Sequence, residues 1–466
     1  MPSVTPYVLP APRVCPTPDL GALTTLVPHQ LVADALTAAG VQTQRMRRLP
    51  ALVTVYLVLA MPLFPSLAYH QLQSRIKGAW EIPGPGPWRK VTDSAISRAR
   101  ERLPARVFQH LFGALVGLQA GGAEGRWRGY RLVAIDGTSM EMADTTPNEA
   151  AFGGPVAEQG RRVGFPQLRM VGLVDCHTRA ALAAEFDRFD RGEGRLAATL
   201  TGAITKGMLV LADRLFVGVE LLHMIRMAGG EVLWRVKSGV ATRPIKDGVL
   251  ADGTYLAQLR SGGHHGRGWI TGQRPKPITV RIIEFELDGK LHRLLTSLLD
   301  PDQAPARKLI LLYSQRWQIE TFFRELKGDE QGRRRLLRSR TPNGVKQEIW
   351  ACLIIHLLTR WLAGEVVELV GRDKLDNPNR ISFKHALDLI KDHLRPGLRL
   401  TLRRFLGWAV AALAQPSSLV YRSAKQRNNP RRVRHRPMRY SKHTPAAIPF
   451  DPARIVLLHR SCPLAA

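Results

Sequence analysis

The sequence predicts an α/β protein in which a helical region precedes the sheet and another follows it. Three observations predict this class. Residues 20–118 carry apolar residues at helical spacing, whereas from Arg131 the pattern changes to the short apolar runs of strands. A strong helical pattern returns after Thr341. The 466 residues suffice for two or three domains with a full-sized core.

The N-terminal region, residues 1–120, is predicted to be an all-helical domain that binds DNA. Its helical segments read LTTLVPHQLVADALTAAG, ALVTVYLVLAMPLF and SAISRARERLPARVFQHLFGALVGLQ, and the Pro/Gly stretch EIPGPGPWRK separates the second from the third. Thr92 or Asp93 is expected to cap the third segment.

Three arginines decorate the start of that third segment. They are Arg98, Arg100 and Arg102. A helix with this pattern either lies along DNA or simply presents a solvated face, and the sequence leaves both readings open.

The middle of the chain, residues 121–350, is expected to form the catalytic domain. After the linker GGAEGRWRG come three predicted strands, RLVAIDGTSM, LRMVGLVD and RAALAAEFD, then a helix over about 194–206 and the strand MLVLAD. Strand, strand, strand, helix, strand, helix is the order of a ribonuclease-H-like α/β core. A β-rich insertion over about 231–299 follows, and it contains the loop SGGHHGRGW.

Residues 313–327, YSQRWQIETFFRELK, are predicted to form one amphipathic helix. At roughly 100° per residue, its polar stripe groups Tyr313, Arg316, Glu320 and Lys327, with Arg324 beside them. The adjoining apolar face consists of Leu312, Ile319, Phe322, Phe323 and Leu326. A carboxylate held among cations and a phenol suits a metal-binding acid that faces a phosphodiester. Salt bridges from Glu320 to Arg316 and Arg324 on an ordinary helix are the alternative.

Residues 351–466 are expected to form a helical C-terminal region with a basic tail. The tail, residues 421–443, is dense in arginine and contains no acidic residue. The whole chain has a net charge of +30 and a pI near 11.0. Such a surplus points to a polyanionic partner, because phosphates supply most non-specific nucleic-acid affinity. A merely soluble basic surface is the alternative.

The cysteines and apolar runs exclude other classes. Cys15, Cys176, Cys352 and Cys462 form no CxxC pair, so neither a disulfide framework nor a zinc knuckle is expected, and a reducing cytoplasm fits. The pair Cys352 and His356 lies in an apolar run and is predicted to be core, and His264–His265 is predicted to be exposed. No signal peptide is recognised, and the apolar run 51–64 is too short to span a bilayer.

Three carboxylates are the candidate catalytic and metal-binding residues: Asp136, Asp213 and Glu320. The apolar runs VAID and LVLAD lead directly into the two aspartates, and a charge at a buried strand's end requires a partner. Divalent cations between such acids would relieve their repulsion, and oxygen ligands suit Mg²⁺. A turn at Asp136-Gly137 is the alternative. Weaker candidates are Asp144, Asp175, Glu185, Asp187 and Asp190.

These residues together resemble the bacterial insertion-sequence DDE transposases that carry a Tyr-Arg-Glu-Lys signature, the insertion sequence four family. The signature stands intact as Tyr313, Arg316, Glu320 and Lys327. Asp136-Gly137-Thr138 and Asp213-Arg214-Leu215-Phe216 are similar to the contexts of the family's two aspartates. The similarity spans roughly residues 25–365.

The resemblance implies a ribonuclease-H-like core and cleavage at inverted-repeat ends with transfer into target DNA, performed by a multimer, expected to be a homodimer on DNA. It implies that Asp136, Asp213 and Glu320 hold Mg²⁺ or Mn²⁺. Tyr313, Arg316 and Lys327, with Arg324, would contact phosphates of double-stranded DNA. In relatives that form a DNA hairpin, a tryptophan of the insertion stacks on a flipped base. Trp234 and Trp269 are available, although a core or surface role is the simpler reading of each.

Two other functions remain open at this point. A non-catalytic DNA-binding descendant would keep the basic surface, and a metal-dependent nuclease could use the same core without joining DNA. The expected location is the bacterial cytoplasm, in association with the nucleoid and not with a membrane.

Overall fold

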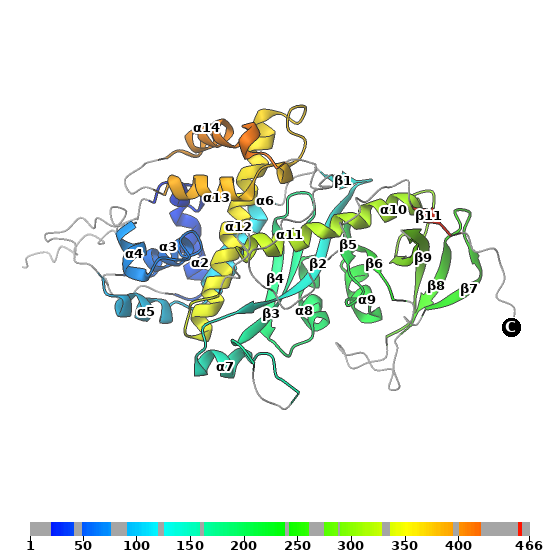
Figure 1. Cartoon of the computed structure of the whole chain (residues 1–466), viewed down its shortest axis with the longest axis horizontal. Helices are drawn as coiled ribbons and strands as arrows, with labels where there is room; N and C mark the ends of the chain where they lie inside the picture. The colour runs from blue at the N-terminus through cyan, green and yellow to red at the C-terminus, as the bar shows by residue number, and fades with distance from the viewer. Residues whose placement is uncertain are drawn as a thin grey trace, which may run out of the picture.

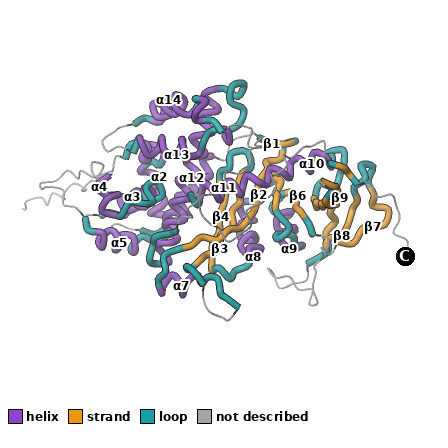
Figure 2. The backbone as a smooth tube through the Cα atoms, in the orientation of Figure 1, coloured by secondary structure: helices purple, strands orange, loops and turns teal. Residues whose placement is uncertain are grey.

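The computed structural model describes residues 20–41, 49–75, 91–119, 125–158, 163–237, 242–260, 275–287, 289–328, 336–394, 400–420 and 455–458. In this part of the chain, one mixed sheet runs through the molecule and most helices gather at one end of it (Figures 1 and 2). The predicted α/β class is therefore confirmed.

The N-terminal region is helical throughout its described residues. It contains α1 (Ala22–Leu26), α2 (His29–Ala38), α3 (Ala51–Ala60), α4 (Tyr69–Arg75), α5 (Asp93–Glu101) and α6 (Arg106–Gln119). The apolar run that predicted a buried helix forms α3, in which Val53 to Ala60 are buried. Of the two predicted caps, Thr92 caps α5, because its Oγ1 accepts a hydrogen bond of 3.3 Å from the amide of Ala95.

The sheet has the strand order β4-β3-β2-β5-β6-β10-β9-β8-β7, with β1 added to β2 and β11 added to β9. Its strands are β1 (Arg126–Trp127), β2 (Tyr130–Glu141), β3 (Gln167–Asp175), β4 (Ala181–Arg188), β5 (Met208–Ala212), β6 (Glu231–Arg235), β7 (Thr242–Val249), β8 (Tyr255–Leu259), β9 (Ile278–Leu287), β10 (Lys290–Thr296) and β11 (Val456–Leu457). Between them lie α7 (Thr146–Phe152), α8 (Glu193–Thr199), the 3₁₀ turn η2 (Leu200–Ala203) and α9 (Val219–Met227).

The first part of the sheet mixes antiparallel and parallel pairs. β2 pairs antiparallel with β3, and β3 with β4, whereas β5 is parallel to both β2 and β6. The expected strand and helix order is present, with α7 in addition. One expectation was wrong: Asp136 does not end its strand, because β2 continues to Glu141 and stays paired with β3.

The second part of the sheet is antiparallel and matches the predicted β-rich segment. β7, β8, β9 and β10 pair in that order, and β10 also pairs with β6. Residues 231–235, at the start of the predicted insertion, form β6 and are parallel to β5. The antiparallel part of the predicted insertion therefore begins after β6, with β7.

Helices cover both faces of the sheet. Alternate residues of β2 point to opposite faces. Leu132 and Ala134 pack in the cluster that contains α11 (Trp317–Leu326) and α12 (Pro342–Val370), whereas Val133 and Ile135 pack in the cluster that contains α8 and α9. Both faces are apolar, which explains the continuous apolar runs in β2 and β5.

The signature segment is not one helix, so that expectation was wrong. It forms α10 (Ala306–Tyr313), the 3₁₀ turn η3 (Ser314–Arg316) and α11 (Trp317–Leu326). Of its predicted apolar face, Ile319, Phe322, Phe323 and Leu326 are buried, whereas Leu312, on α10, is half-buried.

The C-terminal region is helical as expected. It contains α12 (Pro342–Val370), η5 (Pro378–Arg380), α13 (Phe383–Asp392), α14 (Leu402–Leu413) and η6 (Pro416–Ser418). α12 runs without a break through residue 350, where a domain boundary was predicted. The basic tail 421–443 lies outside the described residues.

Cys176, Cys352 and His356 are buried, as predicted for the last two, while Cys15, Cys462 and the pair His264–His265 lie outside the described residues. Within the described ranges, every helix is too short or too polar to cross a membrane.

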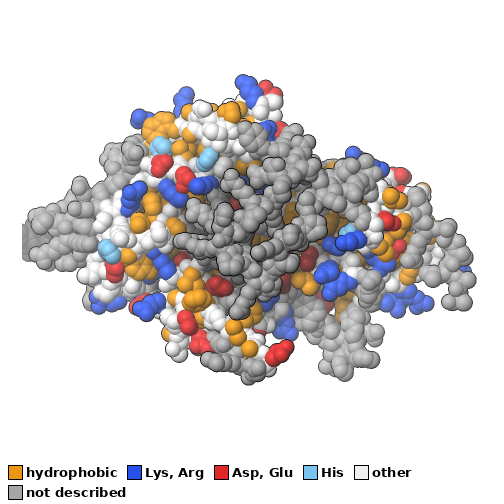
Figure 3. Space-filling view, viewed as in Figure 1, with side chains coloured by type: hydrophobic (Ala, Val, Ile, Leu, Met, Phe, Trp, Pro, Cys, Tyr) orange, Lys and Arg blue, Asp and Glu red, His pale blue; other side chains and the backbone are white. Residues whose placement is uncertain are grey.

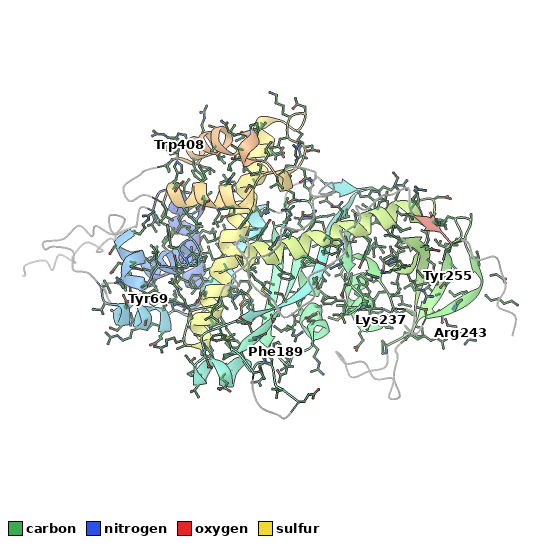
Figure 4. All side chains as sticks on the ribbon, in the orientation of Figure 1. Tyr69, Phe189, Lys237, Arg243, Tyr255 and Trp408 are labelled. Atoms are coloured by element: carbon green, nitrogen blue, oxygen red, sulfur yellow. The ribbon has the colours of Figure 1, made fainter. Side chains whose placement is uncertain are left out.

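Arg100 corrects the reading of α5 as a helix with three DNA-facing arginines. Its side chain is buried, with 5% of its surface exposed. It donates to Gln347 Oε1 at 3.0 Å and to Ser339 Oγ at 2.9 Å, and it also bonds the hydroxyl of Tyr69, which α4 supplies (Figure 4). Arg100 therefore joins α4 and α5 to the start of α12, and only Arg98 and Arg102 are exposed.

We predict that Arg100→Met destabilises the protein by about 2–4 kcal/mol, because it leaves several buried acceptors without a donor. Arg98→Met, on the exposed face of the same helix, should leave the free energy of unfolding unchanged. Denaturant unfolding of the two variants measures this, and equal stabilities would contradict the assigned role of Arg100.

Candidate active site

The site is built where β5 ends beside β2. The last pair in their parallel register is Ile135 with Ala212. Asp136 and Asp213 are therefore the next residues along these two neighbouring segments of the chain. Asp136 shares the parity of Ala134, and Asp213 that of Leu211, both of which pack on the face covered by α11. The two aspartates therefore approach each other on that face.

Backbone amides fix both aspartates. Asp136 Oδ1 accepts from the amide of Gly137 at 2.8 Å, and Asp213 Oδ1 accepts from the amide of Leu215 at 2.7 Å. These bonds leave the second oxygen of each carboxylate available to other partners.

Arg316 lies between two of the predicted acids. Its Nη1 donates to Asp136 Oδ2 at 3.2 Å, and its Nη2 donates to Glu320 Oε1 at 2.7 Å. Its side chain is 12% exposed, and that of Glu320 is 39% exposed. The 3₁₀ turn η3 delivers Arg316 and α11 delivers Glu320, so the break in the helix sits beside the site.

The Arg316 guanidinium lies between the carboxylates of Asp136 and Glu320. Within the described ranges, no three or more acidic, histidine or cysteine side chains are arranged as a metal site. The three acids nevertheless suit a divalent cation chemically, because hard carboxylate oxygens around a shared space are the ligands that Mg²⁺ prefers.

Tyr313 fixes the end of α10 to the same place. Its hydroxyl donates to the carbonyl of Ala212, the residue before Asp213, at 3.3 Å. Burial raises the pKa of Tyr313 to about 12, so the hydroxyl keeps its proton at neutral pH.

Arg324 and Lys327 lie farther along α11. Arg324 is exposed and donates to Thr321 Oγ1 at 3.3 Å, and Lys327 is the C-cap residue of the helix. The structure thus brings Asp136, Asp213, Tyr313, Arg316 and Glu320 together, and sets the other two cations one and two turns beyond Glu320.

Glu193, which the sequence reading missed, adds a further carboxylate. It begins α8, on the other face of the sheet, and leans over Gly137: a Cβ on that glycine would lie 2.4 Å from Glu193 Cδ. Arg169 holds it through a 2.8 Å ion pair, with its own guanidinium 4.9 Å from the ring of Phe189 (Figure 4). No sequence motif marks Glu193. The one signal for it was Gly137, because only a residue without a side chain leaves room for the Glu193 carboxylate beside Asp136.

The environment of Asp136 disfavours its charge. Burial raises the pKa of Asp136 to about 6, and the negative charges of Asp213 and Glu193 act in the same direction. The Gly137 amide and the Arg316 guanidinium oppose them. Acids that repel each other in a partly buried space gain most from an added cation.

The simpler reading of Trp234 as a core residue is confirmed. Trp234 is completely buried in the core, and Trp269 lies outside the described residues. Trp317, which was not considered, is 63% exposed and follows Arg316, whose guanidinium carbon lies 5.7 Å from the ring centre. Among the described residues named here, Trp317 is therefore the tryptophan next to the site.

Comparison with known proteins gives consistent matches. Residues 127–358 match the family described as the transposase DDE domain, and residues 17–113 match the insertion element 4 transposase N-terminal family. The transposase InsG for insertion sequence element IS4 of Escherichia coli (strain K12) is 29% identical over 420 residues, which cover 88% of this chain and 91% of that protein. The putative transposase InsZ of the same strain is 25% identical over 283 residues, or 58% of this chain and 90% of that protein.

A solved structure of the piggyBac transposase synaptic complex with hairpin DNA covers 90% of this chain and 91% of its own, at 10% identity and a TM-score of 0.40, too low to add to the assignment. The two family matches and the similarity to InsG along nearly the whole chain are sufficient. The chain belongs to the DDE transposases of the insertion element 4 type.

We predict that two substitutions shift the titration of Asp136 in opposite directions. Glu193→Gln removes a like charge and should lower the pKa of Asp136 from about 6, whereas Arg316→Gln removes an opposite charge and should raise it, each by up to about one pH unit. Carboxyl ¹³C NMR of aspartate-labelled protein, with Asp136→Asn to assign the signal, measures both. Shifts of the same sign would contradict the described arrangement.

Proposed function

We propose that this DNA transposase binds the inverted-repeat ends of an insertion sequence, cleaves them by phosphoryl transfer and joins them to target DNA. The observation that carries the proposal is that Asp136 and Asp213 directly follow paired residues of β2 and β5, while Arg316 bonds both Asp136 and Glu320 of α11. Family membership supplies the reaction class.

The catalytic core in this proposal is ribonuclease-H-like. Strands β2, β3 and β4, then α8, β5, α9 and β6 supply its elements, and the antiparallel strands β7 to β10 form the insertion before the glutamate. The proposed domains are residues 1–120, 121–350 and 351–466, with α12 joining the last two.

Asp136, Asp213 and Glu320 are proposed to hold two Mg²⁺ ions, or Mn²⁺. Bound there, such ions would activate the attacking water or hydroxyl and stabilise the leaving oxygen. The residues' own tasks are to present oxygens from three separate elements and to keep them fixed. Backbone amides of Gly137 and Leu215 do this for the aspartates.

Arg316 is proposed to exchange partners when DNA enters. In the structure it neutralises Asp136 and Glu320, which would otherwise repel each other. A guanidinium can grip two phosphate oxygens at once. Moving to a phosphate of the substrate would therefore free both carboxylates at the moment when charge develops on the scissile phosphate.

The remaining cations of α11 are proposed to bind the DNA backbone. Arg324 is exposed one turn beyond Glu320, and Lys327 ends the helix, so both can follow a phosphate strand away from the site. Tyr313 has a different contact in the structure, to the Ala212 carbonyl. Its proposed phosphate contact requires that bond to be shared or released.

Double-stranded DNA is also proposed to contact basic side chains outside α11. On the face shown in Figure 3, Lys and Arg side chains form several separate groups rather than one stripe. Lys237, which follows β6, and Arg243, on the edge strand β7, are exposed (Figure 4). A homodimer on DNA and a cytoplasmic, nucleoid-associated location are part of the same proposal.

We predict that Asp136→Asn, Asp213→Asn and Glu320→Gln each lower strand cleavage by at least about 10³-fold, because each removes a charged ligand oxygen and preserves shape. The assay incubates full-length protein with Mg²⁺ and a labelled element end, then with target DNA. Asp190→Asn, an exposed turn acid with 70% of its side chain accessible, is the matched control and should cleave normally.

Three outcomes separate the alternatives. Cleavage without joining would favour a nuclease, and end binding without either step would favour a non-catalytic descendant. Equal activity of the wild type and the three variants would refute the assigned acids. Melting temperatures near that of the wild type establish that the variants are folded.

A further inference from the structure

Glu325 is a buried carboxylate that the proposed chemistry does not use. It lies on α11, five residues after Glu320 and about 140° around the helix axis from it. Its side chain is 6% exposed, and it is enclosed by Arg179, His356 and Arg360. These three side chains and Glu325 form what we call the α11 clamp.

Arg179 connects the clamp to the sheet. It lies in the turn between β3 and β4 with a φ of 61°, a left-handed conformation that is costly for arginine. Its Nε donates to Gln318 Oε1 at 2.6 Å, and its Nη1 donates to Glu325 Oε1 at 3.0 Å. Since Gln318 and Glu325 are two turns apart on α11, one guanidinium holds the helix at two points.

α12 supplies the other side of the clamp. His356 Nε2 lies 3.0 Å from Glu325 Oε2, and Arg360 Nε donates to the same oxygen at 3.1 Å while its Nη2 reaches Oε1. The His356 ring also packs edge-on against Phe322 of α11, with centroids 4.8 Å apart. Each oxygen of Glu325 therefore has two partners: Arg179 and Arg360 bond Oε1, and His356 and Arg360 bond Oε2.

Stability alone does not account for this arrangement. A buried ionic cluster is generally no more stabilising than apolar side chains of similar volume, since desolvation offsets the attraction. Burial by itself would raise the pKa of Glu325, but Arg360, His356 and Arg179 hold it at about 2, so the carboxylate is charged at neutral pH. What such directional bonds add is a fixed geometry.

Apolar packing leaves the setting of α11 less defined. Ile319, Phe322, Phe323 and Leu326 bury one face of the helix, but non-directional contacts tolerate small rotations and slides. Directional bonds from the β3–β4 turn and from α12 to the Glu325 carboxylate do not tolerate such movements. β3 is also the neighbour of β2, where Gly172 pairs with Asp136.

We propose that Arg179 and Glu325, with His356 and Arg360, are positioning residues: they set the rotation and axial position of α11, and thereby place Glu320 against Asp136 and Asp213. The inference rests on the proposed function. No contact between the clamp and the three acids is needed, because a rigid helix of ten residues connects them.

The test compares two arginines that lie near the end of β3, Arg179 in the β3–β4 turn and Arg131 on the neighbouring strand β2. Arg179→Gln breaks the clamp. Arg131→Gln is the matched control, because the Arg131 side chain is 18% exposed, against 15% for Arg179. Arg131 forms a 2.6 Å ion pair with Asp175 of β3, and not with a residue of α11. Full-length protein is assayed for end-DNA affinity, for the single-turnover cleavage rate at saturating DNA, and for Mn²⁺ affinity by electron paramagnetic resonance of the free ion.

We expect Arg179→Gln to lower both the cleavage rate and the Mn²⁺ affinity by about 10–100-fold, as misplacement of a ligand does, with DNA affinity unchanged. Arg179→Lys, which restores the charge but only one bond, should recover part of each. Arg131→Gln should match the wild type in all three measurements.

Equal effects of Arg179→Gln and Arg131→Gln, or a loss confined to DNA affinity, would overturn the inference. If Arg179→Gln does not fold, Gln318→Ala removes one bond and keeps the buried ion pairs; it should lower the cleavage rate and Mn²⁺ affinity in the same direction, and wild-type values would again overturn the inference. The proposed function is tested separately. If the wild type cleaves DNA and Glu320→Gln abolishes cleavage, the proposed function stands even when the clamp inference fails. An inactive wild type would refute the proposed function itself.

Discussion

The parallel pairing of β2 with β5 is the constraint on which the site depends. Both strands pack against a buried apolar cluster on each face, so a slip of either strand by one residue would turn every side chain into the opposite cluster and disrupt the close packing of both. The register therefore fixes Asp136 beside the residue at which β5 ends. α11 covers the same face, and Tyr313 ties the preceding helix to the end of β5. Two of the three proposed catalytic acids are thus brought together by the packing of one strand pair.

Electrostatics then decides which side chains can share that space. Burial and two neighbouring acids push the pKa of Asp136 upward, and Arg316 opposes them while it also holds Glu320. The cation of the signature is thus part of the folded site as well as a phosphate ligand in the proposed reaction. This double use explains why an arginine suits the position: its two terminal nitrogens reach two carboxylates in a fixed planar geometry, whereas a lysine offers a single ammonium nitrogen.

Much of this could be predicted from the sequence, because strong local patterns carried it. Apolar runs leading to Asp136 and Asp213, and the signature around Glu320, gave the acids and the α/β order. The 3₁₀ turn η3 was missed, since one tightened turn hardly changes helical periodicity. Arg100 and Glu193 were misread or missed because their partners, Gln347 and Gly137, are neighbours only in the fold. Long-range contacts of polar residues leave no periodic trace.

α12 gives the molecule a mechanical property. Its 29 residues form one uninterrupted helix, about 43 Å long at 1.5 Å per residue. Near its start it receives Arg100 from the N-terminal helices, and farther along it supplies His356 and Arg360 to Glu325. Because all of these bonds are made to one helix, its backbone sets the distance between them. The N-terminal helices and the helix that bears Glu320 are therefore anchored to the same continuous backbone.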